Sequence, residues 1–135
     1  MLDTSVWVRV LEGDEATARD LAAAQGVLST ATSPIVLAEL ASILARGRLQ
    51  VDRPLEAVLG ACVVEDLTPE DALAAGKLHG SLRAAGHEKV GLGDCLIYAT
   101  AQRVGALLVT CDADLAAQKG VALLGAPRAP RRRAP

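Results

Sequence analysis

Apolar and β-branched residues are concentrated in short runs, and longer segments with helical spacing separate these runs. The runs have the length of strands, and they are VLSTAT at 27–32, CVVEDL at 62–67, ALLVT at 106–110 and VALLG at 121–125. A continuous apolar run such as ALLVT is typical of a parallel strand that is buried on both faces. The segment MLD at 1–3 is a further, very short candidate strand. The pattern predicts a sheet whose strands alternate with helices.

Two of the predicted helix starts are marked by favourable capping residues. Ser33 is a preferred N-cap residue, and Pro34 after it suits the first helical position. Thr68 is followed by Pro69 and then by Asp71, an arrangement similar to a capping box. The predicted helices cover 6–11, 14–26, 34–46, a short stretch around 54–61, 68–85 and 94–105.

The alternation of strands and helices predicts an α/β fold in which a mostly parallel sheet lies between layers of helices. A length of 135 residues suits one domain, which we expect to span residues 1–126. The Pro- and Arg-rich residues 127–135 are predicted to be a disordered tail. In folds of this class, ligands bind beyond the carboxyl ends of the strands. Asp3 and Asp112 each follow a predicted strand, so neighbouring strands would place both at one edge of the sheet.

The net charge of −2 excludes a strong basic field over the whole molecule, although the charge is unevenly distributed. Four of the 14 basic residues are arginines in the predicted tail, at positions 128, 131, 132 and 133. This distribution is compatible with an acidic, metal-binding body and a tail that contacts RNA, or with a tail that is merely solvated. Trp7 and Tyr98 are the only aromatic residues, which argues against base stacking as the main mode of RNA binding.

The cysteine and hydropathy patterns restrict the kind of protein further. The three cysteines lie far apart without a CxxC pattern, and only two histidines accompany them, so a structural zinc site is not expected. Free thiols suit a reducing compartment. No signal region is visible, and no apolar stretch reaches the roughly 18 residues of a membrane span. We therefore expect a cytoplasmic protein without membrane association.

Four acidic residues stand out by their surroundings. Besides Asp3 and Asp112, Glu39 lies in the apolar segment VLAELASIL, and Asp94 precedes the apolar run CLIYA. Each has an ordinary explanation: a helix cap for Asp3, the solvent edge of a helix for Glu39, a helix N-terminus for Asp94 and a turn for Asp112 and Asp114. Together, however, the four would repel one another strongly without a cation. Carboxylate oxygens of this kind suit Mg²⁺ or Mn²⁺.

The four acids lie in four short segments, which are LDTSV at 2–6, SPIVLAEL at 33–40, GLGDCLIYATA at 91–101 and LLVTCDADL at 107–115. In this order and at this spacing, the segments together resemble the PIN-domain ribonucleases, and specifically the VapC-type toxins of bacterial toxin–antitoxin pairs. The resemblance implies a three-layer α/β/α sandwich that cleaves RNA with Mg²⁺ or Mn²⁺. It also implies a homodimer and a cognate antitoxin protein. Only Met1 and Leu2 precede Asp3, so the first strand is minimal or the natural start lies upstream.

The resemblance assigns roles to individual residues. The catalytic and metal-binding acids it implies are Asp3, Glu39, Asp94 and Asp112, with Ser5 and Thr110 as supporting polar groups and Asp114 as a peripheral acid. The predicted reaction is attack of metal-activated water on a phosphodiester, without a side-chain nucleophile.

The RNA contacts are predicted from basic residues near the acids. Arg83, His87 and Lys89 precede Asp94 and are candidates for contacts with phosphates, or simply a solvated loop. Trp7 is a candidate for base stacking, although a buried or interface position is favoured.

Other classes of protein agree less well with the sequence. A haloacid-dehalogenase-like phosphatase needs a second acid where Ser5 stands, and a receiver domain needs acidic residues where Met1 and Leu2 stand. Nothing in the sequence fixes a Ser–His pair. A PIN-like domain that binds RNA or a partner without cutting stays open as the alternative function.

Overall fold

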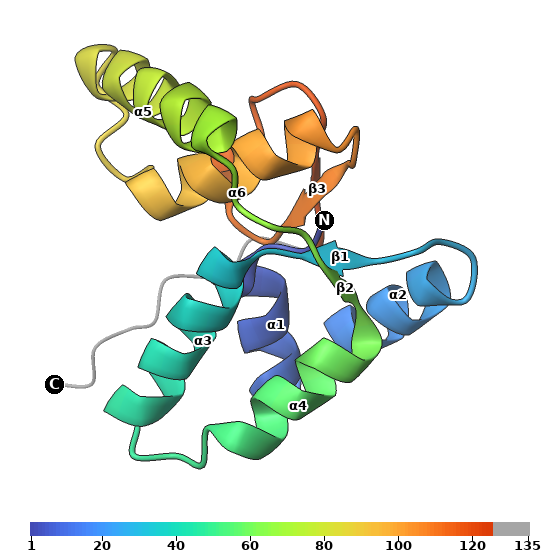
Figure 1. The fold of residues 1–135 in the computed structure, drawn as a ribbon. Helices are drawn as coiled ribbons and strands as arrows, with labels where there is room; N and C mark the ends of the chain where they lie inside the picture. Colours follow the sequence, from blue (N-terminus) through green and yellow to red (C-terminus); the bar gives the residue numbers. More distant parts are fainter. Residues whose placement is uncertain (126–135) are drawn as a thin grey trace, which may run out of the picture.

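The computed structural model describes residues 1–125 as short strands that alternate with helices (Figure 1). In chain order the elements are α1 (Thr4–Leu11), α2 (Glu15–Gln25), β1 (Ala31–Thr32), α3 (Pro34–Arg46), α4 (Asp52–Ala61), β2 (Val63–Val64), α5 (Pro69–Ala84), α6 (Leu92–Arg103), β3 (Leu108–Thr110), a 3-10 turn η1 (Ala113–Leu115) and β4 (Val121–Leu123). The predicted domain boundary at residue 126 and the predicted tail at 127–135 lie outside the described residues.

The strands are joined into one parallel arrangement by the first three residues. β1 pairs in parallel with β2, and β3 pairs in parallel with β4. Between the two pairs, the Leu2 N–H donates to the Ala31 carbonyl at 2.8 Å, and the Asp3 N–H donates to the Val109 carbonyl at 3.0 Å. The order across the sheet is therefore β2, β1, residues 1–3, β3 and β4. This order makes residues 1–3 central, so the carboxyl ends of the first segment and of β3 are neighbours.

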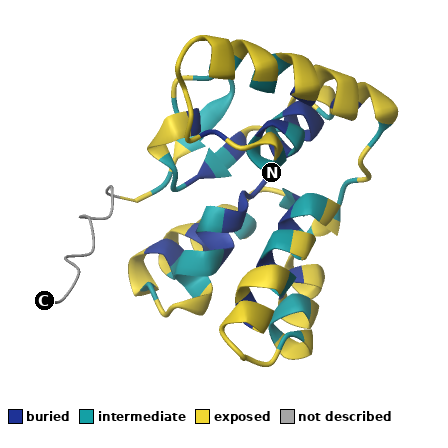
Figure 2. Cartoon of the chain, turned by 90° about the vertical axis from the view of Figure 1, so that its left-hand side faces the viewer, coloured by how far each residue is buried: buried dark blue, intermediate teal, exposed yellow. Residues whose placement is uncertain are grey.

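Helices cover the sheet on two sides. Helices α5 and α6 pack together on one side, whereas α1 to α4 lie on the other (Figure 1). Buried residues gather on the strands and on the inner helix faces, while the outer faces of the helices are exposed (Figure 2). The largest fully buried apolar side chains are Leu40, Ile97, Leu108, Leu115, Val6, Val36 and Val58. The predicted α/β fold with a parallel sheet between helix layers is confirmed.

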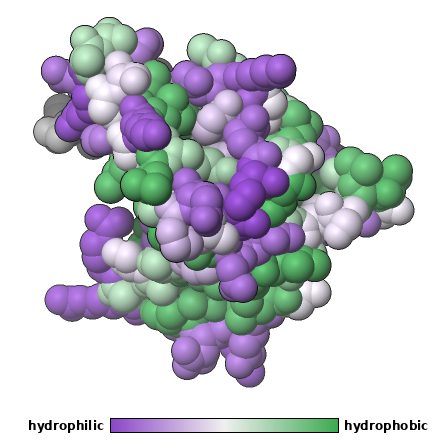
Figure 3. All heavy atoms as spheres, turned by 45° about the horizontal axis from the view of Figure 1, so that its top comes forward, coloured by the Kyte–Doolittle hydropathy of each residue, from purple (hydrophilic) through white to green (hydrophobic). Residues whose placement is uncertain are grey.

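The strands are shorter than the apolar runs predict. Of residues 27–32 only Ala31 and Thr32 form a strand, and the prediction is wrong for Val27 and Leu28, which are 84% and 65% exposed. Their N–H groups both donate to the Ala24 carbonyl at the end of α2, so the helix end and not a strand satisfies this backbone. Hydrophobic atoms project at the edge of the molecule in Figure 3, in keeping with the exposed loop between α2 and β1. Likewise, residues 62–67 contribute only β2.

The predicted helix starts are confirmed by their capping hydrogen bonds. The Ser33 hydroxyl accepts from the Ile35 N–H at 3.1 Å, and Pro34 begins α3. Thr68 and Asp71 form a reciprocal capping box at the start of α5. Across residues 1–125, none of the helices combines the length and the apolar character needed to cross a bilayer.

Candidate metal centre

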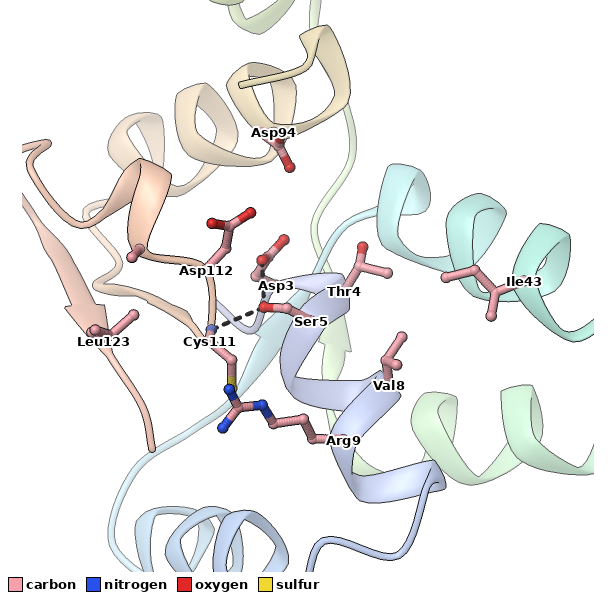
Figure 4. A pocket seen from close by; sticks show the side chains of 11 residues that line it. Asp3, Thr4, Ser5, Val8, Arg9, Ile43, Asp94, Cys111, Asp112 and Leu123 are labelled. Carbon is pink, nitrogen blue, oxygen red and sulfur yellow. Dashed lines mark hydrogen bonds between the residues drawn. The ribbon is translucent and has the colours of Figure 1, made fainter. Parts of the chain in front are cut away.

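Three of the four predicted acids line one cavity at the carboxyl edge of the sheet (Figure 4). Asp3 follows the first parallel segment, Asp112 follows β3, and Asp94 reaches the cavity from the first turn of α6. The cavity has a volume of about 530 Å³. Glu39 projects from α3 into an adjoining cavity, and Thr4 lines both cavities. The fold thus brings together carboxylates that lie far apart in the sequence.

Asp3 is held by two hydroxyl groups. Its Oδ2 atom accepts hydrogen bonds from Ser5 Oγ and from Thr110 Oγ1, each at 2.7 Å. Asp3 stands in the N-cap position of α1, but its side chain makes no capping hydrogen bond, so the helix-cap explanation is wrong. Its Oδ1 atom is buried and has no hydrogen-bond partner. A buried carboxylate oxygen without a partner is costly unless a cation or a proton satisfies it.

Asp94 and Asp112 each use one oxygen for local structure. Asp94 Oδ2 accepts from the Gly91 N–H at 2.8 Å, and Asp112 Oδ1 accepts from the Asp114 N–H at 2.9 Å. The helix-terminus explanation for Asp94 and the turn explanation for Asp112 are therefore both confirmed. Within residues 1–125, no hydrogen bond occupies the second oxygen of either side chain. Structural anchoring thus leaves one oxygen of each carboxylate free to face the cavity.

Glu39 is enclosed by two residues that were not singled out from the sequence. The Thr4 hydroxyl donates to Glu39 Oε2. The other carboxylate oxygen, Glu39 Oε1, lies so close to Gly93 that a Cβ atom there would be only 2.6 Å from it. The signal available in the sequence was adjacency alone, because Thr4 follows Asp3 and Gly93 precedes Asp94.

The electrostatics of Asp94 show how closely the acids are grouped. Burial, together with the negative charges of Asp3, Glu39 and Asp112, raises the pKa of Asp94 to about 6, although the hydrogen bond from the Gly91 N–H lowers it. All three of the other acids therefore act on Asp94 through space. An acid whose pKa is raised by like charges is one that a bound cation would stabilise in its ionised form.

Within residues 1–125, Asp71 is a buried acid that, unlike the acids at the sheet edge, is paired with a basic side chain. Its side chain is 1% exposed, and Arg103 Nε lies 2.9 Å from its Oδ1 atom. Burial alone would raise its pKa, but hydrogen bonds from Arg103 and the Thr68 N–H outweigh burial and hold the pKa below the ordinary value. Asp71 is thus satisfied inside the protein, whereas the acids at the sheet edge accept only neutral hydroxyl and amide donors among the described residues.

The residues present fit a hard divalent ion. Among residues 1–125, no three acidic, histidine or cysteine side chains are arranged closely enough to enclose an ion as they stand. Mg²⁺, however, is commonly held by one or two carboxylates and keeps several water ligands. The donors that the acids offer are oxygens, and Asp3 Oδ1 is a buried acceptor without a partner. The donor chemistry therefore agrees with Mg²⁺ or Mn²⁺.

The other predicted site residues are more widely distributed. Asp114 is exposed, and together with His87 and Lys89 it lines a separate cavity. Arg83 Nη1 donates to the Glu88 carbonyl at 2.7 Å, so Arg83 holds the loop before α6 in place. Trp7 is only 5% exposed, which confirms the buried position and makes base stacking by Trp7 wrong. The cavity that holds Asp3 also includes a cation, Arg9, and apolar side chains that the sequence did not single out.

The fold and site define an α/β protein with a parallel sheet and acids at its carboxyl edge, and comparison with known proteins identifies the family. The chain belongs to the PIN domain family, whose model matches residues 1–121. No curated protein sequence matches the chain significantly.

Solved structures with a similar fold come from several bacteria. VapBC2 from Rickettsia felis bound to a promoter DNA fragment has a TM-score of 0.75 at 23% identity, covering 92% of this chain and 96% of that chain. A toxin–antitoxin complex from Klebsiella pneumoniae has a TM-score of 0.71 at 20% identity, covering 90% and 93%. DNA-bound VapBC from Salmonella typhimurium has a TM-score of 0.69 at 24% identity, covering 92% and 95%. The predicted resemblance to PIN domains is confirmed, and the likeness to VapC-type chains holds at the level of the fold.

Proposed function

We propose that this chain is a divalent-metal-dependent endoribonuclease that acts as the toxin of a toxin–antitoxin pair. The observation that carries the proposal is the convergence of Asp3, Glu39, Asp94 and Asp112: burial of Asp94, together with the negative charges of the other three acids, raises its pKa to about 6. Membership of the PIN domain family supports nuclease chemistry at these acids. A phosphodiester carries negative charge, so a cation is needed before it can approach four carboxylates.

Each residue has a proposed task. Asp3, Asp94 and Asp112 line the cavity and would hold Mg²⁺ or Mn²⁺ with their free oxygens. Glu39 would serve as a further ligand or would orient the attacking water. When bound, the ion supplies Lewis-acid chemistry that offsets charge on the phosphodiester and favours ionisation of water.

The supporting residues act through Asp3 and Asp112. Ser5 and Thr110 fix Asp3 Oδ2, which leaves the buried Oδ1, an acceptor without a partner, as the candidate ligand atom. The Thr110 hydroxyl also accepts from the Asp112 N–H at 3.0 Å, so one side chain links the two acids. Asp114 acts through its backbone, which orients Asp112.

The proposed partners follow from the solved structures of similar fold. Those structures are VapBC assemblies or toxin–antitoxin complexes, which supports a cognate antitoxin for this chain. We also propose a homodimer and a cytoplasmic location. Size-exclusion chromatography with light scattering on the purified chain tests the dimer, for which the mass must be twice 13.9 kDa.

Cleavage of mixed RNA tests the catalytic proposal. The antitoxin-free chain is incubated with RNA and Mg²⁺ or Mn²⁺, with and without EDTA, beside Asp94→Asn and the control Asp20→Asn, which changes an exposed acid on α2. Wild type and the control should cut, while EDTA or Asp94→Asn should abolish cutting. A wild-type chain that binds RNA but cuts none with either metal would instead establish the alternative, a non-catalytic PIN-like binding domain.

A further inference from the structure

Glu39 reaches the acidic site from α3. Among residues 1–125, no hydrogen bond joins this helix to the acids that line the cavity. The Glu39 carboxylate is the end of a flexible side chain on α3, so something must hold it beside Asp94. Two contacts do so, one at each carboxylate oxygen. One comes from the first residue of α1 and the other from the first turn of α6.

The first contact is a hydrogen bond from Thr4. Thr4 is largely buried, at 8% exposed, and its hydroxyl donates to Glu39 Oε2. Thr4 stands between Asp3 and Ser5, which are themselves joined by a hydrogen bond of 2.7 Å. One tight segment therefore orients two acids of the site at once, Asp3 through Ser5 and Glu39 through Thr4.

The second contact is with Gly93, which has no side chain and so leaves room for Glu39 Oε1. A Cβ atom at this position would lie 2.6 Å from Glu39 Oε1, well inside van der Waals distance, and 3.7 Å from Ile35 Cγ2. Gly93 has an ordinary helical position in α6, so backbone strain does not require glycine there. What requires glycine is the space that Glu39 Oε1 occupies directly beside Asp94.

We propose that Thr4 and Gly93 are positioning residues that jointly fix the Glu39 carboxylate at the reacting site. Thr4 holds Oε2 by a hydrogen bond, and Gly93 admits Oε1 to the space next to Asp94. The inference rests on the proposed nuclease function. Both residues should affect the rate of the chemical step, because they determine the position of the Glu39 carboxylate and not whether the protein folds.

The two contacts predict an unusual combination of effects for Gly93→Ala. Alanine favours a helix over glycine, and the atom that it displaces is the far end of a flexible side chain, so the thermal midpoint should stay the same or rise. The displaced Glu39 carboxylate, however, should lower kcat by roughly 10- to 100-fold, with KM changed by less than about twofold. Gly80→Ala in α5 is the matched control, since no atom lies within 4 Å of the added Cβ. It should leave kcat unchanged.

Thr4 is tested with two variants of different chemistry. Thr4→Val keeps the shape of the side chain but removes the hydroxyl donor, and it should lower kcat as Gly93→Ala does. Thr4→Ser restores the hydroxyl and should recover most of the rate. If Gly93→Ala and Thr4→Val cut RNA with the wild-type kcat, or if they lose activity only because they unfold, the proposal is overturned.

A double-mutant cycle in thermal unfolding provides a readout that does not depend on cleavage. Gly93→Ala should raise the midpoint more in a Glu39→Ala background than in wild type, because the clash with Oε1 is then absent. Equal shifts in the two backgrounds would overturn the positioning role. A wild-type chain that cuts no RNA while the cycle shows coupling would overturn the nuclease function and the kinetic part of the inference, but not the contact.

Discussion

Thr110 Oγ1 donates a hydrogen bond of 2.7 Å to Asp3 Oδ2, which joins two residues 107 positions apart in the sequence. The same oxygen accepts from the Asp112 N–H at 3.0 Å. The Thr110 side chain is fully buried at the end of β3. It therefore connects the two acids at adjacent strand ends and fixes the direction of the Asp3 carboxylate.

Thr110→Val should distinguish the effect of the Thr110 hydrogen bonds from the effect of its packing. Valine fills the same space but neither donates to Asp3 nor accepts from Asp112, so RNA cleavage should fall by about 10- to 100-fold. The fully buried Thr100 is a matched control, because its hydroxyl bonds to the Leu96 carbonyl and Asp71 outside the site. Thr100→Val should lower the free energy of unfolding by about 1–2 kcal/mol without altering the cleavage rate at a temperature where it is folded. Equal loss of activity in both variants would contradict the role given to Thr110.

Replacement of Asp71 should change the free energy of unfolding but not the rate of RNA cleavage. Asp71→Asn removes the charge that pairs with Arg103 and should lower the free energy of unfolding at pH 7 by about 1–3 kcal/mol. Because the folded pKa of Asp71 is lowered from its ordinary value of 3.8, its contribution is present above that pH and is lost as the pH falls through the folded pKa. Urea unfolding at pH 7 and at pH 3 checks this, with a smaller difference between wild type and variant at pH 3. The cleavage rate of the folded variant should equal that of wild type.

Local sequence signals were sufficient for the helix starts and for the general location of the acids. Ser33 and Thr68 cap their helices through neighbours within three positions, so no distant contact is needed to predict them. Asp3 and Asp112 could be placed together because parallel strands share a carboxyl edge. That rule depends on the order of elements and not on side-chain detail.

The strand lengths and the enclosure of Glu39 depend on contacts between distant segments. Val27 and Leu28 have an apolar sequence suited to a strand, but their N–H groups donate to the Ala24 carbonyl at the end of α2 and not to a neighbouring strand. The roles of Thr4 and Gly93 arise only when α1, α3 and α6 meet around Glu39. The hydrophobic periodicity of a single segment cannot predict such contacts between three helices.

Asp94 should make the metal-free protein less stable as the pH rises. Its folded pKa of about 6 is above its ordinary value of 3.8, so its favourable contribution is fully present below the ordinary value and is lost as the pH rises through 6. Asp94→Asn removes the charge and should increase the free energy of unfolding at pH 7.5 by roughly 1–2 kcal/mol in EDTA. The gain should disappear near pH 4. Urea unfolding of both proteins at the two pH values measures it, and a gain that is the same at both would show that neither burial of the Asp94 charge nor repulsion from the other acids is its cause.

Bound Mg²⁺ should offset the repulsion among these acids and stabilise the folded protein. This effect on stability can be measured without RNA. An ion that binds only the folded state at 100 times its dissociation constant adds about 2.7 kcal/mol to the free energy of unfolding. The thermal midpoint of wild type should therefore rise with added Mg²⁺ or Mn²⁺ and should return with EDTA. Asp3→Asn and Asp112→Asn should lose most of this rise, because each removes a charged oxygen donor at the cavity. Asp20→Asn, whose side chain is exposed on α2, should keep the full rise. A rise of the same size in all four proteins would place the ion elsewhere on the molecule, since general screening of surface charge does not distinguish Asp3 from Asp20.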